Sequence, residues 1–245
     1  MLLKSSTKLI LQLSFIILIS VACDRQKGST IEATAAEQVD PVANATKLEI
    51  DTAMSIITWI GTKPTDQHDG IISISDGYAA VDKGKLVGGV VNIDIRSLHI
   101  MDIKPEESGY TKLKKHLMSD DFFDADNYPT GSFTITEVMT YDSAKLVLGE
   151  EEFESEYTPA SLTTFMVKNP THILSGNLTL RGVTKNISFP ASIIVSEESV
   201  KAEAKFNIDR TNWNLSYDDE SSVIDRAKDK FIYNTVNVGF NLETR

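Results

Sequence analysis

Cysteine is almost absent from this sequence, since Cys23 is the only one among 245 residues. A single thiol cannot form a disulfide within the chain, so no part of the fold depends on oxidation. The four histidines, His68, His99, His116 and His172, are scattered, and no two lie at the spacing of metal ligands. We therefore expect neither a metal site nor a cofactor.

Common catalytic signatures are absent as well. The chain contains no Gly-x-Ser-x-Gly motif, no glycine-rich phosphate loop and no His-Glu-x-x-His helix. The neighbours Asp209 and Arg210 carry charges that could serve catalysis, but a turn contact or a structural ion pair is the simpler interpretation. The sequence accordingly predicts a protein that is not an enzyme.

Basic residues are in the minority, with 24 Lys and Arg against 35 Asp and Glu and a net charge of −11. An acidic surface repels polyanions, which argues against binding to nucleic acid and against electrostatic docking on anionic lipid. The densest acidic run spans residues 150–156 and is typical of a solvated loop. Calcium binding by this run is the alternative.

Long apolar runs are limited to residues 9–21. This run follows two lysines, is too short to span a membrane comfortably and has the flanks of a signal peptide. It ends in Ala22 and Cys23, which resembles a bacterial lipobox, although Ser20 stands where leucine is usual. The resemblance implies cleavage after residue 22 and attachment of acyl chains such as palmitate to Cys23, each buried CH₂ adding ~0.8 kcal/mol to the anchor. An ordinary secreted protein with an incidental cysteine is the alternative.

Residues 1–22 are thus predicted to be a lipoprotein signal peptide, and the remainder divides into two parts. Residues 23–46 are rich in Ala, Thr, Glu, Gln and Asp, with Ile31, Val39 and Val42 as isolated larger apolar residues. These few apolar residues bury too little surface to offset the entropy lost on ordering. A flexible tether is therefore expected. Residues 47–245 have the length of one β-domain.

Strand patterns dominate the domain. Apolar and polar residues alternate with a period of two in eight segments, which predicts strands with one buried face. These segments are residues 55–61, 70–78, 86–98, 133–141, 171–180, 186–196, 199–208 and 231–242. In the third, Val87 and Val91 are expected on the buried face, and Gly88-Gly89 predicts a bend or bulge. Residues 145–148 are expected to pair with 133–141 as a hairpin.

Helical patterns are few. Residues 110–118 have apolar positions at helical spacing, with Ser108 placed to cap the helix and the helix expected to cover one end of the domain. Residues 221–228 predict one more helical turn. The fold class is therefore all-β with one main helix. Antiparallel strands with one apolar face form a sandwich or a barrel, and an eight-stranded barrel has room inside for side chains or for one small ligand.

Four segments of the domain, taken in order, resemble the YceI-like family of small bacterial envelope proteins. They are residues 57–61 (Ile-Thr-Trp-Ile-Gly), 117–124 followed by Tyr-Pro-Thr at 128–130, 176–185 (Gly-Asn-Leu-Thr-Leu-Arg-Gly-Val-Thr-Lys) and 206–213 (Phe-Asn-Ile-Asp-Arg-Thr-Asn-Trp). Each segment is weakly specific alone, whereas four in order make a specific match. The resemblance implies an antiparallel lipocalin-like barrel of about eight strands that holds a polyisoprenoid lipid in the cell envelope.

Three features depart from the family pattern. Thr62 and Lys63 stand where the family often has a histidine, and the nearest histidine here is His68. Asn214 follows Trp213 where glycine is common, and the acidic run at 150–156 is an insertion. These departures concern contacts with the head group of a ligand more than an apolar tunnel.

The resemblance and the alternation together give candidate ligand contacts. The expected apolar contacts are Ile57, Trp59, Val91, Ile93, Phe133, Ile135, Leu178, Leu180, Phe189 and Phe206. The candidate polar contacts are His68, Asp209 and Arg210. An isoprenoid or other long-chain lipid is the expected ligand, because apolar burial is non-directional and scales with area.

The expected setting is a bacterial membrane to which lipidated Cys23 anchors the protein, facing the periplasm or the cell surface. Two other functions remain open at this stage. One is a barrel with a filled core that binds proteins through its acidic surface, and the other is an enzyme acting on an isoprenoid. A second copy of the chain is a further candidate partner, as a homodimer.

Overall fold

The computed structural model describes residues 30–146, 155–221 and 231–245. The predicted signal peptide, Cys23 and the first residues of the predicted tether lie outside these ranges. So do residues 147–148, most of the acidic run 150–156 and nearly all of the predicted helical turn at 221–228. No helix in the described part of the chain is both long enough and apolar enough to cross a membrane.

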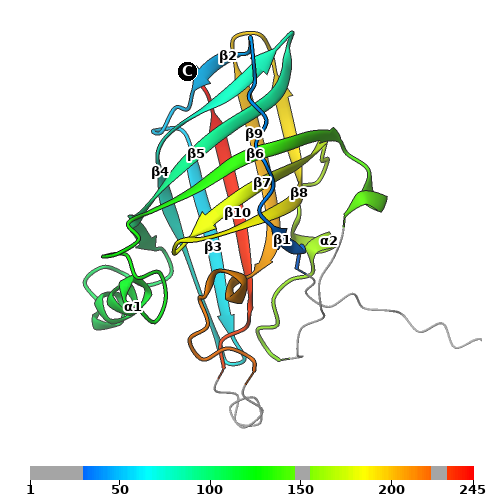
Figure 1. Cartoon of the computed structure of the whole chain (residues 1–245). Coiled ribbons are helices and arrows are strands. Elements are labelled where there is room, and N and C mark those ends of the chain that lie inside the picture. The colour runs from blue at the N-terminus through cyan, green and yellow to red at the C-terminus, as the bar shows by residue number, and fades with distance from the viewer. Residues whose placement is uncertain (1–29, 147–154, 222–230) are drawn as a thin grey trace, which may run out of the picture.

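Eight long strands form one closed antiparallel barrel (Figure 1). They are β3 Ile56–Lys63, β4 Asp66–Asp82, β5 Lys85–Ile100, β6 Thr130–Thr140, β7 His172–Leu180, β8 Val183–Val195, β9 Val200–Asp209 and β10 Thr235–Glu243. The order around the barrel is β8-β7-β6-β5-β4-β3-β10-β9, and pairing of β8 with β9 closes the ring. All eight predicted strands are therefore confirmed, and the sandwich alternative is excluded.

Two short additional strands lie where neighbouring strands of the barrel separate. β8 pairs with β9 only at residues 191–195. The edge of β8 at residues 185–187 pairs instead with β1 (Ala33–Ala35). β4 likewise pairs with β3 only up to Ser73. Its residues 78–81 pair instead with β2 (Thr46–Glu49). An unpaired strand edge has free N–H and C=O groups, which explains why these short segments dock there.

The prediction of a flexible tether over 23–46 does not hold for residues 30–35, which are ordered against the barrel. Ile31 is only 2% exposed, and its amide donates to the Asn207 carbonyl at 2.9 Å. Composition could not show this, because the segment is ordered by edges that exist only after the barrel closes. Residues 36–45, called the strap hereafter, connect β1 to β2 across the outside of the barrel (Figure 1).

The bulge predicted at Gly88-Gly89 is present in the β4–β5 pair. Ala80 pairs with Gly88 and Val81 pairs with Leu86, so Val87 has no partner. An extra residue shifts the alternation by one position and sends the side chain to the opposite face. Val87 is accordingly 39% exposed, and its predicted place on the buried face is wrong.

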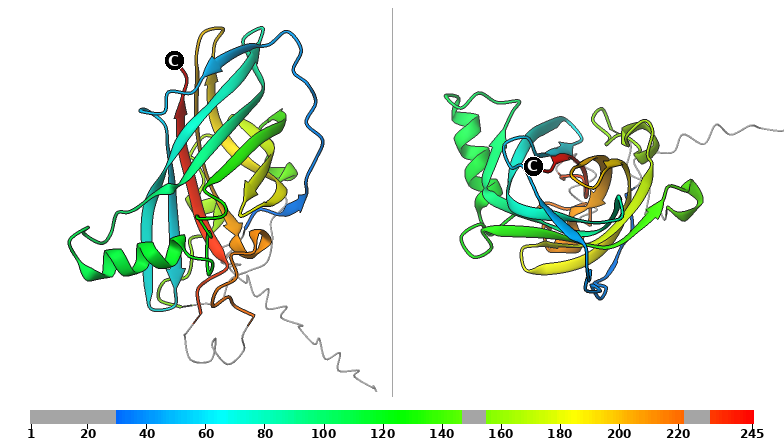
Figure 2. Two further views of the ribbon diagram at one scale, coloured as in Figure 1. Left: turned by 60° about the vertical axis from the view of Figure 1, so that its left-hand side comes forward. Right: turned by 90° about the horizontal axis from the view of Figure 1, so that it is seen from above.

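The predicted main helix is α1 (Ser108–Met118), but its cap and its position differ from expectation. Glu107 occupies the N-cap, no side chain caps the helix, and Ser108 lies inside it. The helix packs beside β5 on the outside of the barrel instead of covering an end (Figure 2). Its half-buried Tyr110 bonds through its hydroxyl to Nδ1 of His99 at 2.8 Å, which fixes the helix to the strand.

The remaining helical elements are short. They are the 3₁₀ turn η1 (Ser143–Lys145), the helix α2 (Leu162–Phe165) and the 3₁₀ turn η2 (Arg210–Trp213). The hairpin predicted between 133–141 and 145–148 does not form at its described end, because Lys145 belongs to η1. β6 pairs instead with β7 over residues 132–140 and with β5 over residues 130–134.

Candidate functional site

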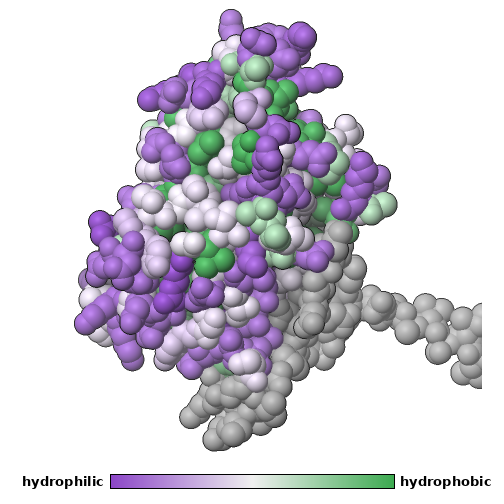
Figure 3. Space-filling model, viewed as in Figure 1, coloured by the Kyte–Doolittle hydropathy of each residue, from purple (hydrophilic) through white to green (hydrophobic). Residues whose placement is uncertain are grey.

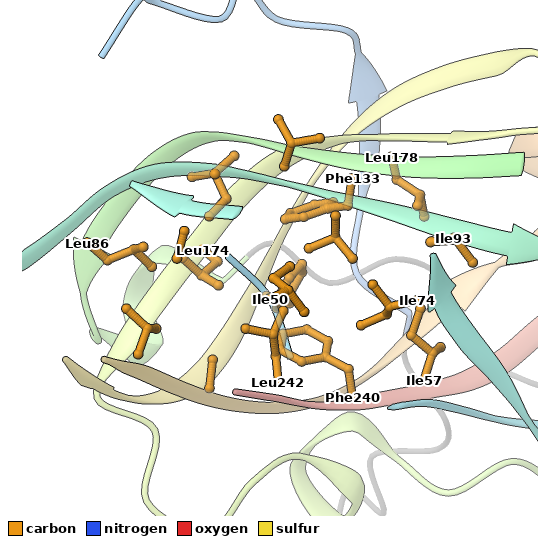
Figure 4. Close-up of a pocket in the computed structure, with 18 of the residues that line it drawn as sticks. Ile50, Ile57, Ile74, Leu86, Ile93, Phe133, Leu174, Leu178, Phe240 and Leu242 are labelled. Atoms are coloured by element: carbon orange, nitrogen blue, oxygen red, sulfur yellow. The ribbon is translucent and has the colours of Figure 1, made fainter. Parts of the chain in front are cut away.

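The half of the barrel nearer the β4–β5 and β8–β9 turns, called the upper half, is hollow. Its cavity has a volume of about 110 Å³, and all the empty space in and around it, open solvent included, amounts to about 850 Å³. Side chains from strands all around the barrel point into this space, as Figure 4 shows for Ile57, Phe133 and Leu242.

The lining is almost purely apolar. Tyr78 is the only lining residue with a polar atom in its side chain, and none of the others is an acid, a base or a cysteine. The cavity can therefore bury a hydrocarbon chain but offers no charged partner to a polar head group. Each Å² of apolar surface that a ligand buries here contributes ~25 cal/mol.

Four aromatic rings line one side of the cavity. Phe189 stacks on Phe206 with ring centroids 4.2 Å apart and an interplanar angle of 13°. Phe133 and Phe240 approach Phe189 at 5.5 and 5.9 Å between centroids. Such contacts add about 0.5–1.5 kcal/mol per pair beyond area burial, so this wall is held by its own packing and does not need a ligand.

Partial exposure of inward side chains distinguishes a hollow from a filled core. Val91, Phe133 and Phe240 line the cavity and yet are only half-buried, whereas Phe189 is 1% exposed. In a filled barrel, inward residues of this kind would be buried by side chains from the opposite wall. The filled-core alternative therefore does not describe the upper half of this barrel.

The lower half, toward η2 and the β3–β4 turn, is closed. Trp213 of η2 has no exposed surface, and its Nε1 donates to the Leu178 carbonyl at 2.9 Å. Phe122, which precedes β6, is also buried and joins Trp213 in the apolar core. A ligand in the upper half therefore meets a packed floor.

Eight of the ten predicted apolar contacts line the cavity. They are Ile57, Val91, Ile93, Phe133, Ile135, Leu178, Phe189 and Phe206. Trp59 and Leu180 do not line it. Trp59 lies against Gly70 of β4, where an added Cβ would be 2.7 Å from Cζ2 of the indole. Leu180 is buried and packs on Gly131 of β6, where an added Cβ would be 2.9 Å from its Cδ2.

The three predicted polar contacts lie away from the cavity. His68 bonds through Nδ1 to Asp102 at 2.7 Å near the β3–β4 turn, in the lower half. Asp209 accepts from the amide of Thr211 at 2.9 Å and so caps η2. Arg210 is buried, and its guanidinium donates to backbone carbonyls around η2. The turn-contact interpretation of Asp209 is therefore confirmed, and none of the three can touch a ligand in the cavity.

Several lining residues were not among the predicted contacts. They include Ile50, Ile74, Tyr78, Ala79, Leu86, Leu174, Val238, Phe240 and Leu242. The period-two pattern could have found most of them, because they share a face with predicted contacts on the same or adjacent strands. Ile50 had no such signal, since it follows β2 and is turned inward by a backbone bond to Gly77. Within the described ranges, no group of three or more His, Cys, Asp or Glu is placed to hold a metal ion.

An eight-stranded antiparallel barrel with a packed floor and a hollow apolar upper half is a lipocalin-like barrel of the kind that can hold one small ligand. The family model of the YceI-like domain matches residues 38–244, and the chain belongs to that family. No curated protein matches the sequence.

Solved structures with similar folds include three bacterial proteins. BcnA from Burkholderia cenocepacia is 16% identical with a TM-score of 0.54, and the match covers 80% of this chain and 99% of that one. A polyisoprenoid binding domain from Saccharophagus degradans, implicated in plant cell wall breakdown, is 14% identical over 80% and 95% of the two chains, with a TM-score of 0.48. The YceI protein of Campylobacter jejuni is 21% identical over 70% and 81%, with a TM-score of 0.43.

Proposed function

We propose that this protein binds one long apolar lipid, an isoprenoid or a similar chain, in the upper half of its barrel and performs no chemistry on it. The observation that supports the proposal is a hollow lined by apolar side chains with Tyr78 as the single polar exception. Such a lining favours a hydrocarbon tail over any ligand with internal polar groups, because buried polar groups without partners cost free energy. Family membership makes an isoprenoid the first ligand to test.

The lining also constrains how a ligand lies. The packed floor around Trp213 leaves no space for a polar head group at the lower end, and the walls provide no charge to bind one. The tail therefore occupies the cavity, and the head group stays at the opening. An enzyme acting on the same lipid would need an acid–base pair beside the reacting atoms, and no lining residue is Asp, Glu, His or Lys.

Binding through the acidic outer surface is the other function considered, and the hollow favours lipid binding over it. A barrel that served only as an interaction surface would gain stability from a filled core, because unfilled space costs about 24 cal/mol per Å³. An interior kept open at such a cost is explained by a ligand.

The purified protein should release an apolar lipid when it is extracted with organic solvent and analysed by mass spectrometry. We expect about one lipid per barrel, since one apolar cavity occupies the upper half of the barrel. The delipidated protein should then bind an added polyprenyl alcohol. Preparations that yield no lipid and bind no added polyprenol would refute the proposed function.

We further propose that the protein is anchored in the bacterial envelope through lipid on Cys23. Support comes from the sequence alone, namely the apolar run at 9–21 that ends at the only cysteine. Cells fed an alkyne-tagged palmitate should label the wild-type protein, whereas Cys23→Ala should lose essentially all label and appear in the soluble fraction. Equal labelling of both proteins would contradict the anchor and would leave lipid binding by the barrel untouched.

A further inference from the structure

The barrel wall has a third place where neighbouring strands separate, and no strand fills it. β5 and β6 pair only between Val90–Asp94 and Thr130–Thr134. Above this point, residues 85–89 of β5 and 135–140 of β6 have no ladder between them, and the two strands diverge (Figure 1). The corresponding separations beside β8 and β4 are occupied by β1 and β2.

This separation lies directly beside the cavity. Gly89 and Val90 on its β5 side and Ile135 on its β6 side all line the hollow. Val90 and Ile135 are half-buried, although both belong to the wall of an apolar site. No backbone ladder closes the wall here, and the side chain of Ile135 packs on Gly89, where an added Cβ would lie 3.3 Å from its Cδ1.

Both ends of the barrel are restricted. The floor is packed around Trp213, as described above. At the upper end, a Cβ added to Gly84 in the β4–β5 turn would lie 3.7 Å from Oε1 of Glu197 in the β8–β9 turn. Ile50 is turned inward beside these turns and is only 3% exposed. The separation between β5 and β6, where no ladder has to break, is therefore the route considered for a long ligand.

The strap crosses the outer wall at the same place. At its start, Asn177 of β7 accepts from the amide of Glu37 at 2.9 Å and donates to the Glu37 carbonyl at 2.7 Å. Further along, Val42 packs on Gly88 of β5. A Cβ added to Gly88 would lie 2.9 Å from Cγ2 of Val42. Between these two contacts the strap passes from β7 to β5, over the point at which β5 and β6 separate.

The strap is fixed at both ends and weakly held between them. β1 and β2 anchor it in the barrel, but within residues 38–45 the only hydrogen bond is local, from the Ala43 amide to the Pro41 carbonyl at 3.1 Å. Residues 36–44 are exposed throughout, and Val39 and Val42 add apolar surface to a mostly polar face (Figure 3). Segments with few buried contacts and few hydrogen bonds open at low free-energy cost.

We propose that the strap is a gate over the separation between β5 and β6, and that it must move aside for the lipid to enter or leave. The proposal rests on the proposed lipid-binding function and assigns the route and its control to the same cavity. The contact of Val42 with Gly88 keeps the gate closed, and the two hydrogen bonds of Asn177 hold its hinge.

A reversible crosslink tests the gate. In a full-length Cys23→Ala background, Val42→Cys and Gly88→Cys place two thiols at the contact where an added Cβ on Gly88 would lie 2.9 Å from Cγ2 of Val42. A disulfide joins Cβ atoms ~3.5–4.5 Å apart, so a small shift of the strap accommodates it. After removal of bound lipid, the uptake and release of a dansyl-labelled geranylgeraniol are followed by stopped-flow fluorescence. The oxidised protein should exchange the probe at least tenfold more slowly than the same protein reduced with dithiothreitol. Val42→Cys alone is the matched control and should not respond to the reductant.

A second variant covers the case in which the disulfide does not form. Asn177→Ala removes both hydrogen bonds to Glu37 and one from the buried Asn186 without changing the cavity lining, so release of the probe should become several-fold faster. Unchanged rates in both the oxidised crosslink and Asn177→Ala would overturn the gate while leaving lipid binding intact. A wild-type protein that binds no probe would instead overturn the proposed function, and the gate with it.

Discussion

Replacing Val91 with tryptophan should weaken lipid binding by the barrel about tenfold or more without unfolding it. Val91 lies on β5, lines the cavity and is only half-buried, so its side chain faces unfilled space. An indole at this position would occupy the volume that a lipid tail needs. Displacing a tail by overpacking costs ~1–3 kcal/mol, so affinity should fall at least about tenfold.

The fold should tolerate this substitution for two reasons. Tryptophan is favoured in strands, and Val91 already pairs with an aromatic residue, Phe133 of β6. The new ring also buries apolar area inside the barrel, so the melting temperature should stay equal or rise. Val238→Trp, which fills the cavity from β10, should give the same result if the β5 position proves too crowded.

The measurement is the amount of lipid per protein after purification, together with titration of a delipidated sample with polyprenol. Ile194→Trp on β8 is the matched control, because Ile194 is 71% exposed and its side chain points away from the cavity. The control should bind lipid like the wild type. Full binding by a folded Val91→Trp protein would show that the ligand site lies elsewhere.

The hollow has a simple origin in side-chain size. The upper half is lined in part by small residues, among them Ala79, Gly89 and Ala202, whereas Trp59 and Trp213 belong to the lower half. Small residues on facing walls cannot meet across an eight-stranded barrel, but two tryptophans and their neighbours can fill it. The same strands therefore build a solid floor and an open chamber above it.

This division explains how far the sequence could predict the site. The alternation of apolar residues identifies the inward face of each strand, which is why Ile57, Val91 and Phe206 were placed on the cavity wall correctly. It does not reveal which side chains from distant strands share one level of the barrel. Trp59 was therefore assigned to the ligand, although it packs against Gly70 below the chamber.

The polar candidates could not be placed from the sequence for a different reason. His68, Asp209 and Arg210 are polar, but polarity alone does not reveal the partner of a side chain. In the structure, those partners are a neighbouring carboxylate, a backbone amide and backbone carbonyls. The strap and β1 were missed because they bind edges and openings that appear only when the barrel is complete.

The largest loss of stability is expected from Arg210, which holds the floor of the barrel together. Its side chain is 3% exposed and donates through Nε to the Tyr233 carbonyl at 3.1 Å. Its two Nη groups donate to the carbonyls of Leu215, Tyr217 and Ile232. Burial lowers the pKa of the guanidinium, and nearby carboxylates led by that of Asp219 oppose this effect. Arginine nevertheless stays protonated in proteins, so its donors remain available over the whole range of folding conditions.

Arg210→Met should therefore lower the free energy of unfolding by at least about 3 kcal/mol, because each buried carbonyl left without a donor costs ~1–3 kcal/mol. Urea denaturation would show this as a lower midpoint at an unchanged m-value. Arg210→Lys should fall nearly as far, since one ammonium group cannot reproduce a planar fork that reaches four carbonyls. Arg181→Met is the matched control, because Arg181 also donates to two backbone carbonyls but is more exposed, and it should cost about 1 kcal/mol. If Arg210→Lys were as stable as the wild type, the positive charge would be what stabilises η2, and the fork of hydrogen bonds would not be.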